Sequence, residues 1–394
     1  MKPVFIPDPR IKWEWLSSHA EVMYLEQHLD KVNWLTIAEN PNAMPLIVEH
    51  FEEKLDRFDW YYLLQHPSIM TLLNNPHLFQ LCKHKLDNYH LNEHPNAIPF
   101  LETHLDYIDW FTLCTNPNAV PLIEKNLDKL SLYEIGAFRL SKKNWYGLSR
   151  NPNAVSLVEQ HLDKINWVGL SRNPNAGRLI EKHPDKIDLS ELCYNTCPEA
   201  IDLLSRNLDS EAIQWDVLSG NPSASTLLEQ RLDKIDWEEA SSNLSILPLL
   251  EKHLDQVHLE LVCCNGDDTT QEAIDFLEKH VEYMNYCCWY RLSALPIAVP
   301  LLEKYPEHIH WAQLSRNAGA IHLLEQHPEK IDWDFLSFNT NAMHLLFRLD
   351  HLQMKQSNEA FKEELMAYVF DPDRLMRFST QYSVDFRDYL QMYS

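Results

Sequence analysis

Apolar and polar residues along this chain follow a pattern that returns about every 22 residues. Residues 151–172 read NPNAVSLVEQHLDKINWVGLSR, and residues 173–194 read NPNAGRLIEKHPDKIDLSELCY. Apolar side chains recur there at intervals of three and four residues, which predicts helix and not an alternating strand. Asn151 can cap the first helix, and Pro152 suits its first position. A second, shorter helix is predicted from Trp167 onward, so each block predicts two short helices.

The same frame extends over most of the chain. Further copies begin near the following positions: Ser18, Asn40, His66, His94, Asn116, Asn195, Asn221, Asn243, Thr270, Leu295 and Asn317. Isolated helices this short are marginal in water, so each must be stabilised by stacking on its neighbours. The sequence therefore predicts an all-α fold, an α-solenoid (superhelix) of about thirteen two-helix repeats of roughly 22 residues, with a fragment from 339 to about 350. The expected organisation is an N-terminal cap (1–17), the repeat solenoid (18–350) and a helical C-terminal cap (351–394).

Two positions in the repeat carry the predicted packing. An aromatic anchor begins the second helix, and Leu189 and Leu259 replace it in two units; the anchors are Trp34, Trp60, Trp110, Trp145, Trp167, Trp215, Trp237, Trp289, Trp311 and Trp333. Four residues later the chain is small, as at Ala38, Cys114 and Ser171. Because this position is one helical turn beyond the anchor, a small side chain there permits close packing between helices.

Composition narrows the possible functions. Seven glycines in 394 residues disfavour sites built on phosphate-binding loops or tight catalytic turns. A net charge of −24 opposes binding to a nucleic-acid backbone and suits a basic protein partner. No signal peptide or membrane-spanning run is recognisable, so an intracellular, non-secreted protein with free thiols is expected.

Cysteine and histidine offer candidate chemistry. The cysteines are Cys82, Cys114, Cys193, Cys197, Cys263, Cys264, Cys287 and Cys288. They lack the spacing of a zinc site, and three of them fall at the small core position, so a structural role is expected. A histidine row shares one position at the end of the first helix: His28, His104, His161, His183, His253, His280 and His327. It suggests either a pH-sensitive or metal-decorated face, or side chains that interact with the helix dipole.

Acidic rows explain the net charge. A glutamate row on the first helix contains Glu26, Glu102, Glu124, Glu159, Glu181, Glu229, Glu251, Glu278, Glu303 and Glu325. An aspartate row follows at the end of that helix, and part of it is expected to cap the next turn. The glutamates form either a solvated face or a docking strip, and a concave groove lined by the glutamate and histidine rows is one hypothesis. The acidic stretch 267–270 is interpreted as a loop.

The NPNA units, the LDKIDW segments and the stretch EELMAYVFDPDRL (363–375) together resemble a known family. They are similar to the Asn-Pro-Asn-Ala helical repeat proteins that giant nucleocytoplasmic DNA viruses encode in many copies. The resemblance covers about residues 18–385 and implies a viral origin and a role beside other interaction proteins. It implies no activity. The regular pattern is lost at 66–93 and 243–294, which are either partner-specific surface or drifted spacers.

The sequence therefore predicts a non-enzymatic protein–protein interaction scaffold or adaptor, with no catalytic, cofactor-binding or metal-binding residues and no cofactor. Its expected partner is a host or viral protein, with no nucleic acid and no membrane, in the host cytoplasm or the virion. The alternative is a structural component of a giant-virus particle. An enzyme of α/α-toroid type and a modular RNA reader are weaker alternatives, because no catalytic motif and no basic groove are present.

Overall fold

The computed structural model describes residues 4–131, 141–263 and 269–350. These residues form short helices joined by turns, with a single two-stranded sheet. The prediction of an all-α chain is confirmed for this part of the protein. The expected C-terminal cap, Cys264 and Asp267-Asp268 lie outside the described residues.

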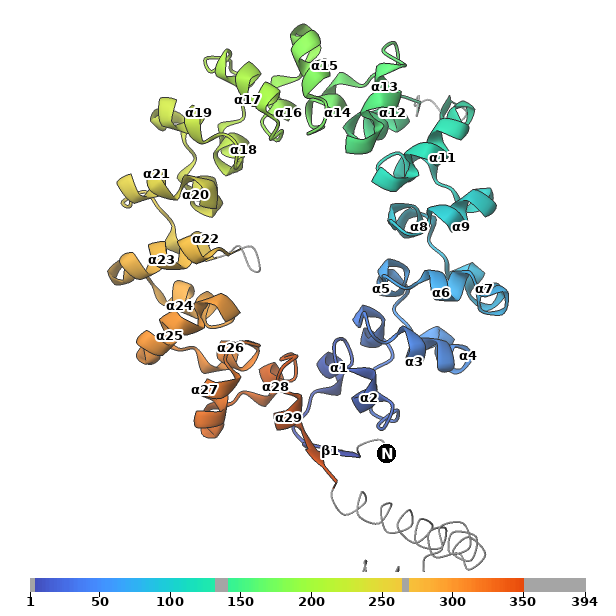
Figure 1. Ribbon diagram of the computed structural model, residues 1–394, viewed down its shortest axis with the longest axis vertical. Coiled ribbons are helices and arrows are strands. Elements are labelled where there is room, and N and C mark those ends of the chain that lie inside the picture. The colour runs from blue at the N-terminus through green and yellow to red at the C-terminus, as the bar shows by residue number, and fades with distance from the viewer. Residues whose placement is uncertain (1–3, 132–140, 264–268, 351–394) are drawn as a thin grey trace, which may run out of the picture.

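The helices follow one another around a ring in two layers (Figure 1). The inner layer contains the Trp-anchored helices: α1 (Trp13–Leu16), η1 (Thr36–Glu39), α5 (Trp60–Gln65), α8 (Asn88–Glu93), α10 (Trp110–Leu113), α12 (Ser141–Arg150), α14 (Trp167–Ser171), α16 (Leu189–Leu192), α18 (Trp215–Gly220), α20 (Trp237–Ser242), α22 (Leu259–Val262), α24 (Tyr286–Leu292), α26 (Trp311–Ser315) and α28 (Trp333–Leu336). The outer layer contains the helices that follow the NPNA positions: α2 (Val22–Leu25), α3 (Met44–Glu49), α4 (Phe51–Lys54), α6 (Met70–Leu73), α7 (Pro76–Cys82), α9 (Ile98–Thr103), α11 (Val120–Lys125), α13 (Val155–Glu159), α15 (Gly177–Lys182), α17 (Pro198–Ser205), α19 (Ser225–Gln230), α21 (Leu247–Lys252), α23 (Gln271–Lys279), α25 (Val299–Lys304), α27 (Ile321–Gln326) and α29 (Met343–Leu346).

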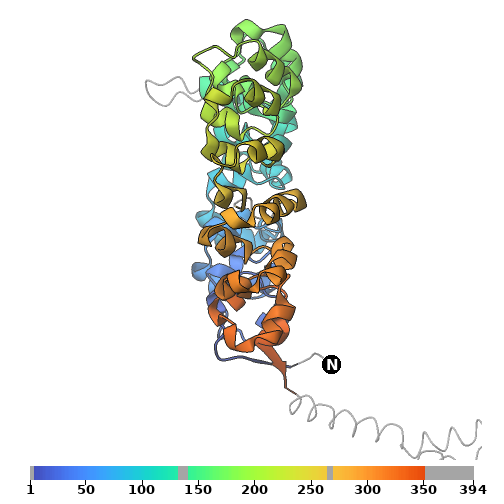
Figure 2. The ribbon, with the colours of Figure 1, turned by 90° about the vertical axis from the view of Figure 1, so that its left-hand side faces the viewer.

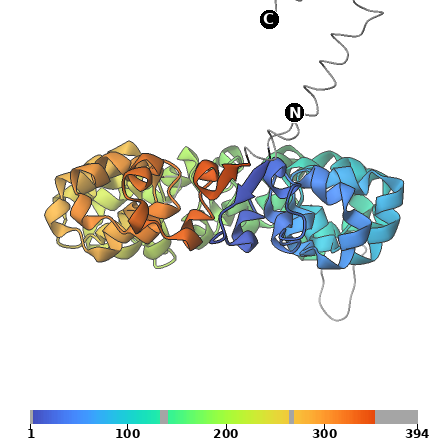
Figure 3. The same ribbon diagram turned by 90° about the horizontal axis from the view of Figure 1, so that it is seen from below.

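Short 3-10 turns connect the layers or open the outer helices: η2 (Leu55–Arg57), η3 (Lys83–Lys85), η4 (Leu105–Tyr107), η5 (Pro117–Ala119), η6 (Leu127–Ser131), η7 (Pro152–Ala154), η8 (Pro184–Lys186), η9 (Leu232–Lys234), η10 (Leu244–Ile246), η12 (Val281–Tyr283), η13 (Pro296–Ala298), η14 (Pro306–His308) and η15 (Pro328–Lys330). Seen edge-on, the ring is a flat band (Figures 2 and 3). Its apolar core lies between the two layers and is continuous from Ile11 to Phe347.

A ladder of buried asparagines joins successive units. Asn173 is fully buried, and its Oδ1 accepts a hydrogen bond from the Asn175 amide at 2.9 Å. Its Nδ2 donates to the carbonyls of Ser149 and Asn151, both at 2.9 Å. Asn151 bonds in the same way to the unit before it. The first residue of NPNA therefore caps its own helix and also satisfies two buried carbonyls of the preceding unit, which explains why an amide is needed there.

The other NPNA residues have equally local reasons. Nδ2 of Asn175 donates to the carbonyl of Pro152, one unit earlier, at 3.0 Å. Ala176 is fully buried, where a larger side chain would have no space. Proline occupies the first turn, where its missing N–H costs nothing.

Histidine replaces the ladder asparagine in two units. Nδ1 of His94 accepts a hydrogen bond from the Asn96 amide at 3.1 Å, and Nε2 bonds to the carbonyl of His66 at 3.2 Å. His66 makes the equivalent bonds to the Ser68 amide and the Asn40 carbonyl. A neutral imidazole with its proton on Nε2 offers one acceptor and one donor, so it reproduces the cap and one of the two carbonyl bonds that the asparagine amide makes.

The small residue after each anchor also links units. Oγ of Ser171 donates to the carbonyl of Trp167 at 2.7 Å and accepts from the Asp188 amide at 3.0 Å. Asp188 in turn caps α16 by accepting from two backbone amides. This hydroxyl therefore fixes the start of the next inner helix against the one before it.

The two ends of the described chain meet and close the ring (Figure 1). Strand β1 (Phe5–Pro7) pairs antiparallel with β2 (Phe347–Leu349). The Lys12 amide donates to Oγ of Ser337 at 3.0 Å, the same bond that Ser171 makes inside the ring. Trp15 and Phe338 stack with ring centroids 4.3 Å apart.

The closing unit is assembled from both ends of the chain. Residues 339–350 supply an outer helix, and Arg10-Ile11-Lys12-Trp13 stands where other units carry Lys-Ile-Asp-Trp. The Arg10 guanidinium lies 3.4 Å from the Trp333 ring centroid, as Lys186 lies over Trp167. Residues 1–17 were predicted to form an N-terminal cap. Instead, α1 takes the place of an inner helix, and β1 pairs with β2, so the two ends of the described chain cover each other.

Candidate interaction surface on the inner helices

The inner helices present a repeated frame with variable exposed positions. In α20, Asp236 caps the helix, Trp237 packs on the core, and Ala240 and Ser241 are buried. The residues one and two places after the anchor are left exposed. Because packing does not constrain them, these positions can differ from unit to unit and carry specificity.

Exposed apolar side chains lie on the inner helices of both halves of the chain, and α24 carries Tyr286 and Tyr290. Those of the first half each have at least 41% of their surface exposed: Leu35, Tyr61, Tyr62, Tyr89, Phe111 and Val168. Soluble proteins rarely expose many large apolar side chains next to one another, so a contiguous patch of them marks a contact surface. Tyrosine in particular offers a large rigid ring with a polar tip.

Three of these side chains, together with His90, form what we call the tyrosine cluster: Tyr61, Tyr62, Tyr89 and His90, on α5 and α8. The Tyr61 ring lies 5.0 Å from Tyr62 and 4.8 Å from His90, and Tyr89 lies 5.2 Å from His90. A hydrogen bond to the Glu93 carboxylate raises the pKa of Tyr89, so its hydroxyl stays protonated and acts as a donor. The cluster is therefore an aromatic patch that also presents tyrosine hydroxyl groups.

Carboxylates dominate the facing side of the ring. We call Asp216, Glu238, Glu239 and Glu260, on α18, α20 and α22, the acidic arc. Figure 1 shows these helices across the opening from α5 and α8. Among the described residues, no ion pair joins Asp216, Glu238 or Glu239 to a basic side chain. The negative charges of these three carboxylates therefore face solvent or a ligand.

A hollow of about 480 Å³ opens beside the acidic arc. Tyr194, Asp216, Val217 and Glu239 contribute to its lining. The guanidinium of Arg172 lies 3.6 Å from the Tyr194 ring centroid and covers one face of this ring. The hollow combines aromatic surface with two carboxylates.

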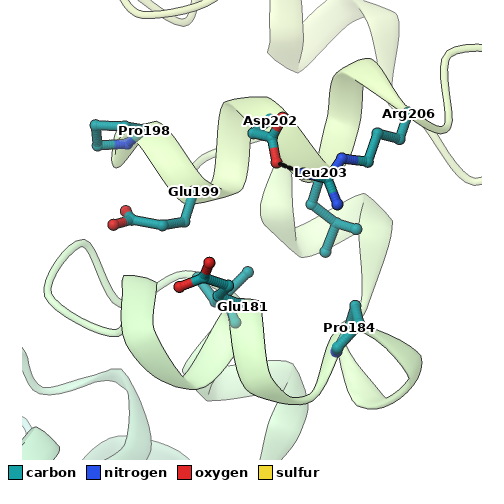
Figure 4. Close-up of a pocket in the computed structure, with 8 residues that line it drawn as sticks. Glu181, Pro184, Pro198, Glu199, Asp202, Leu203 and Arg206 are labelled. Atoms are coloured by element: carbon teal, nitrogen blue, oxygen red, sulfur yellow. Dashed lines mark hydrogen bonds and ion pairs between the residues drawn. The ribbon is translucent and has the colours of Figure 1, made fainter.

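A second hollow lies in the outer layer between α15 and α17 and measures about 250 Å³ (Figure 4). Glu181, Glu199 and Leu203 line it, and Asp202 pairs with Arg206 at one side. The side chain of Glu199 sits against Gly177, where an added Cβ would meet the carboxylate. The ion pair with Asp202 already satisfies the Arg206 guanidinium at this side of the hollow.

Six of the seven described cysteines are buried, and Cys287 is exposed. Cys193 and Cys263 are buried, and each Sγ lies 3.3 Å from the carbonyl four residues earlier, as serine does in other units. Burial raises the pKa of Cys82 to about 11 and that of Cys114 to about 12. Thiols of this kind are poor nucleophiles and poor metal ligands. Within the described ranges, no three His, Cys, Asp or Glu side chains come together as a metal site.

The histidine row ends the outer helices. His104, His183, His253, His280 and His327 are the C-terminal cap residues of their helices. Several pack edge-on against an anchor, as His183 does on Trp167 with ring centroids 5.3 Å apart. Nδ1 of His104 also bonds to the carbonyl of Phe100 at 3.0 Å. The bond to Phe100 lies within one unit, whereas the tryptophan contact holds the histidine ring against the preceding unit.

The glutamate row pairs between units on the outer layer. Glu102 bonds to Lys125 at 3.1 Å, and Glu159 bonds to Lys182 at the same distance. The hypothesis of a concave groove lined by the glutamate and histidine rows is wrong, because both rows belong to the outer helices and the opening is lined by the inner ones (Figure 1). The error arose because the sequence gives the repeat but not the direction in which it curves.

Part of the aspartate row and Thr270 cap helices. The 3-10 turns that contain Asp106, Asp185 and Asp233 have no side-chain cap at their start. Asp87 of this row does cap α8, and in several other units the cap is the residue before the anchor, such as Asp188. Thr270 caps α23 by accepting from the Ala273 amide at 3.3 Å.

The exposed surface of the inner helices was not predicted from the sequence. The exposed tyrosines could have been found at the two positions after the anchor, which vary from unit to unit, as Tyr61-Tyr62, Val168-Gly169 and Glu238-Glu239 do.

Comparison with known protein families, with curated proteins and with solved structures finds no match in any of the three. Among residues 4–131, 141–263 and 269–350, no helix has both the length and the apolar character needed to cross a lipid bilayer.

Proposed function

We propose that this chain is a closed α-solenoid of fourteen two-helix units whose inner wall binds a protein partner, without catalysing a reaction. The fourteenth unit is the one that residues 339–350 and 8–17 form together. The tyrosine cluster is the main support for this proposal, because its rings contact one another and remain largely exposed. Tyrosine is among the residues that contribute most to protein interfaces.

The dimensions of the ring support this use of the inner wall. Helices pack about 9 Å apart, so fourteen inner elements give a perimeter of about 130 Å and about 40 Å between opposite helix axes. Subtracting a helix diameter of about 10 Å leaves an opening of about 30 Å. A helix or a small folded domain fits such an opening.

The outer wall is a weaker candidate. Six of the ten glutamates in its row pair with lysine or histidine of the next unit, as Glu303 does with His322 at 2.7 Å. Such ion pairs are exposed and weak, but they engage most carboxylates of the row.

The test compares two double variants in cells that produce the protein. Tyr62→Ser/Tyr89→Ser removes exposed rings from the inner wall, and Leu105→Ser/Leu232→Ser removes exposed apolar side chains from 3-10 turns outside it. After cross-linking, the bound proteins are quantified by mass spectrometry. We expect a stoichiometric partner that the inner variant loses at least tenfold and the control retains. A partner that survives the inner variant would show that the proposal is wrong.

The viral setting forms part of this proposal and rests on the resemblance to giant-virus NPNA proteins alone. Mass spectrometry of purified particles separates the two roles that follow from it. Abundance in particles together with binding to capsid or core proteins would favour a structural component. Absence from particles together with a host partner would favour an adaptor.

A further inference from the structure

We infer that the inner face of α16 to α20 binds an arginine- or lysine-rich segment of the protein partner, with a basic side chain entering the hollow beside Tyr194. This inference rests on the proposed function and names the chemistry of the partner.

Charge complementarity is the first argument. Asp216, Glu238 and Glu239 are exposed on consecutive inner helices, and within the described residues none of them is paired with a basic side chain. The nearby basic residue Arg172 is already engaged by Glu191 and by the Tyr194 ring. A cationic ligand would therefore find free carboxylates, whereas a nucleic acid or an acidic peptide would be repelled.

The shape and lining of the hollow provide the second argument. Tyr194, Asp216 and Glu239 come from three successive units and converge on one space of about 480 Å³. An arginine side chain needs an apolar surface for its stem and carboxylates for its N–H groups. Val217 and the exposed part of the Tyr194 ring supply apolar surface, although Arg172 already lies over one face of that ring, and Asp216 and Glu239 supply the carboxylates.

The same chemistry recurs elsewhere in the ring. Arg10 lies over Trp333 and also pairs with Asp8, so one guanidinium uses a ring face and a carboxylate together. That site is filled by the chain itself, where the N-terminal segment completes the ring. The hollow beside Tyr194 offers a similar set of groups to a ligand from outside.

The experiment measures binding of the full-length protein to fluorescein-labelled synthetic peptides by fluorescence polarisation. One 20-residue peptide alternates Arg with Leu and Ser, and its partner carries Glu in place of every Arg. Asp216→Asn/Glu239→Gln tests the hollow. Glu124→Gln/Glu229→Gln removes the same charge from exposed positions on outer helices and serves as the matched control.

We expect the basic peptide to bind the wild type with strong salt dependence, the acidic peptide not to bind, and the first variant to lose about tenfold in affinity while the control loses less than twofold. Equal binding by all three proteins would mean that only bulk charge matters, and would overturn the inference. Failure of the basic peptide to bind the wild type would overturn it too. Circular dichroism establishes that each variant is folded.

The partner captured by cross-linking separates this inference from the proposed function. A partner that depends on Tyr62 and Tyr89 but is retained by the Asp216→Asn/Glu239→Gln variant would uphold the proposed function and refute the basic segment. Loss of neither interaction in either variant would refute both.

Discussion

The histidines that stand in for ladder asparagines make one part of the ring sensitive to acid. His94 is 5% exposed, and its Nδ1 accepts from the Asn96 amide at 3.1 Å. A proton on Nδ1 would place two N–H groups against each other and remove the cap. Only the neutral ring therefore fits the folded state.

The direction of the effect follows from the pKa. Burial lowers the pKa of His94 below its ordinary value of 6.5, and the hydrogen bond to the His66 carbonyl opposes this in part. The unfolded chain therefore binds more protons between the folded pKa and about 6.5. The stability that neutral His94 contributes is complete above this window and is lost as the pH falls through it.

The magnitude can be worked out from the bonds. His94→Ala removes a helix cap, worth about 1 kcal/mol, and leaves the buried His66 carbonyl without its donor, at about 1–3 kcal/mol. A loss of about 2–4 kcal/mol at pH 8 is expected. His94→Asn converts HPNA into NPNA and keeps both bonds, so it should cost less than about 1 kcal/mol.

The assay is urea unfolding at pH 8 and pH 5.5, with hydrogen exchange across residues 88–101 to locate the change. The wild type should lose more stability between the two pH values than His94→Asn does. Equal pH dependence in the two proteins would refute the neutral-tautomer argument. A His94→Asn variant as unstable as His94→Ala would refute the equivalence of histidine and asparagine in the ladder.

Three further predictions concern the junctions and the core. Ser171→Ala should cost about 1 kcal/mol in urea unfolding, because the Asp188 amide loses its acceptor, while Ser171→Thr keeps the hydroxyl and tests whether that bond is responsible. Deleting residues 4–12 removes β1 and the Lys12 bond, so the radius of gyration from small-angle X-ray scattering should rise; an unchanged value would mean that the ring closes without this segment. At pH 8, iodoacetamide should leave Cys114 unmodified in the folded protein and modify it in urea, since burial raises its thiol pKa to about 12; rapid modification in the folded state would contradict that burial.

The helices could be predicted because their signals are local. Asparagine before proline, helical spacing of apolar residues and a capping aspartate before tryptophan all act within a few residues. The layer that faces the opening could not be predicted, since curvature depends on small differences in packing between stacked helices. The ring closure left one readable trace, Arg10-Ile11-Lys12-Trp13, which matches the Lys-Ile-Asp-Trp of an internal unit.

At the serine and asparagine positions, the residue pattern was predicted correctly, but the reason given for it was incomplete. The small residue after the anchor was predicted from volume, yet Ser171 also donates and accepts a hydrogen bond. Asn151 was predicted as a cap, yet its amide nitrogen also serves two carbonyls of the preceding unit. Bonds between units join residues about 22 positions apart, and the sequence gives no sign of which side chain reaches which carbonyl.

Closure has a consequence for binding that an open array would lack. Exposed ends of a stacked array normally need polar caps, and here each end covers the other instead. The fourteen units proposed above would each turn by about 26° to complete a circle, and closure then holds the tyrosine cluster and the acidic arc on opposite sides of one opening. A partner that touches both sides should bind less tightly once the junction is broken, because the open chain must pay the entropy of bringing the two walls together. A partner that touches only the acidic arc should bind the opened ring as well as the closed one, so comparing the deletion of residues 4–12 with the wild type distinguishes the two modes.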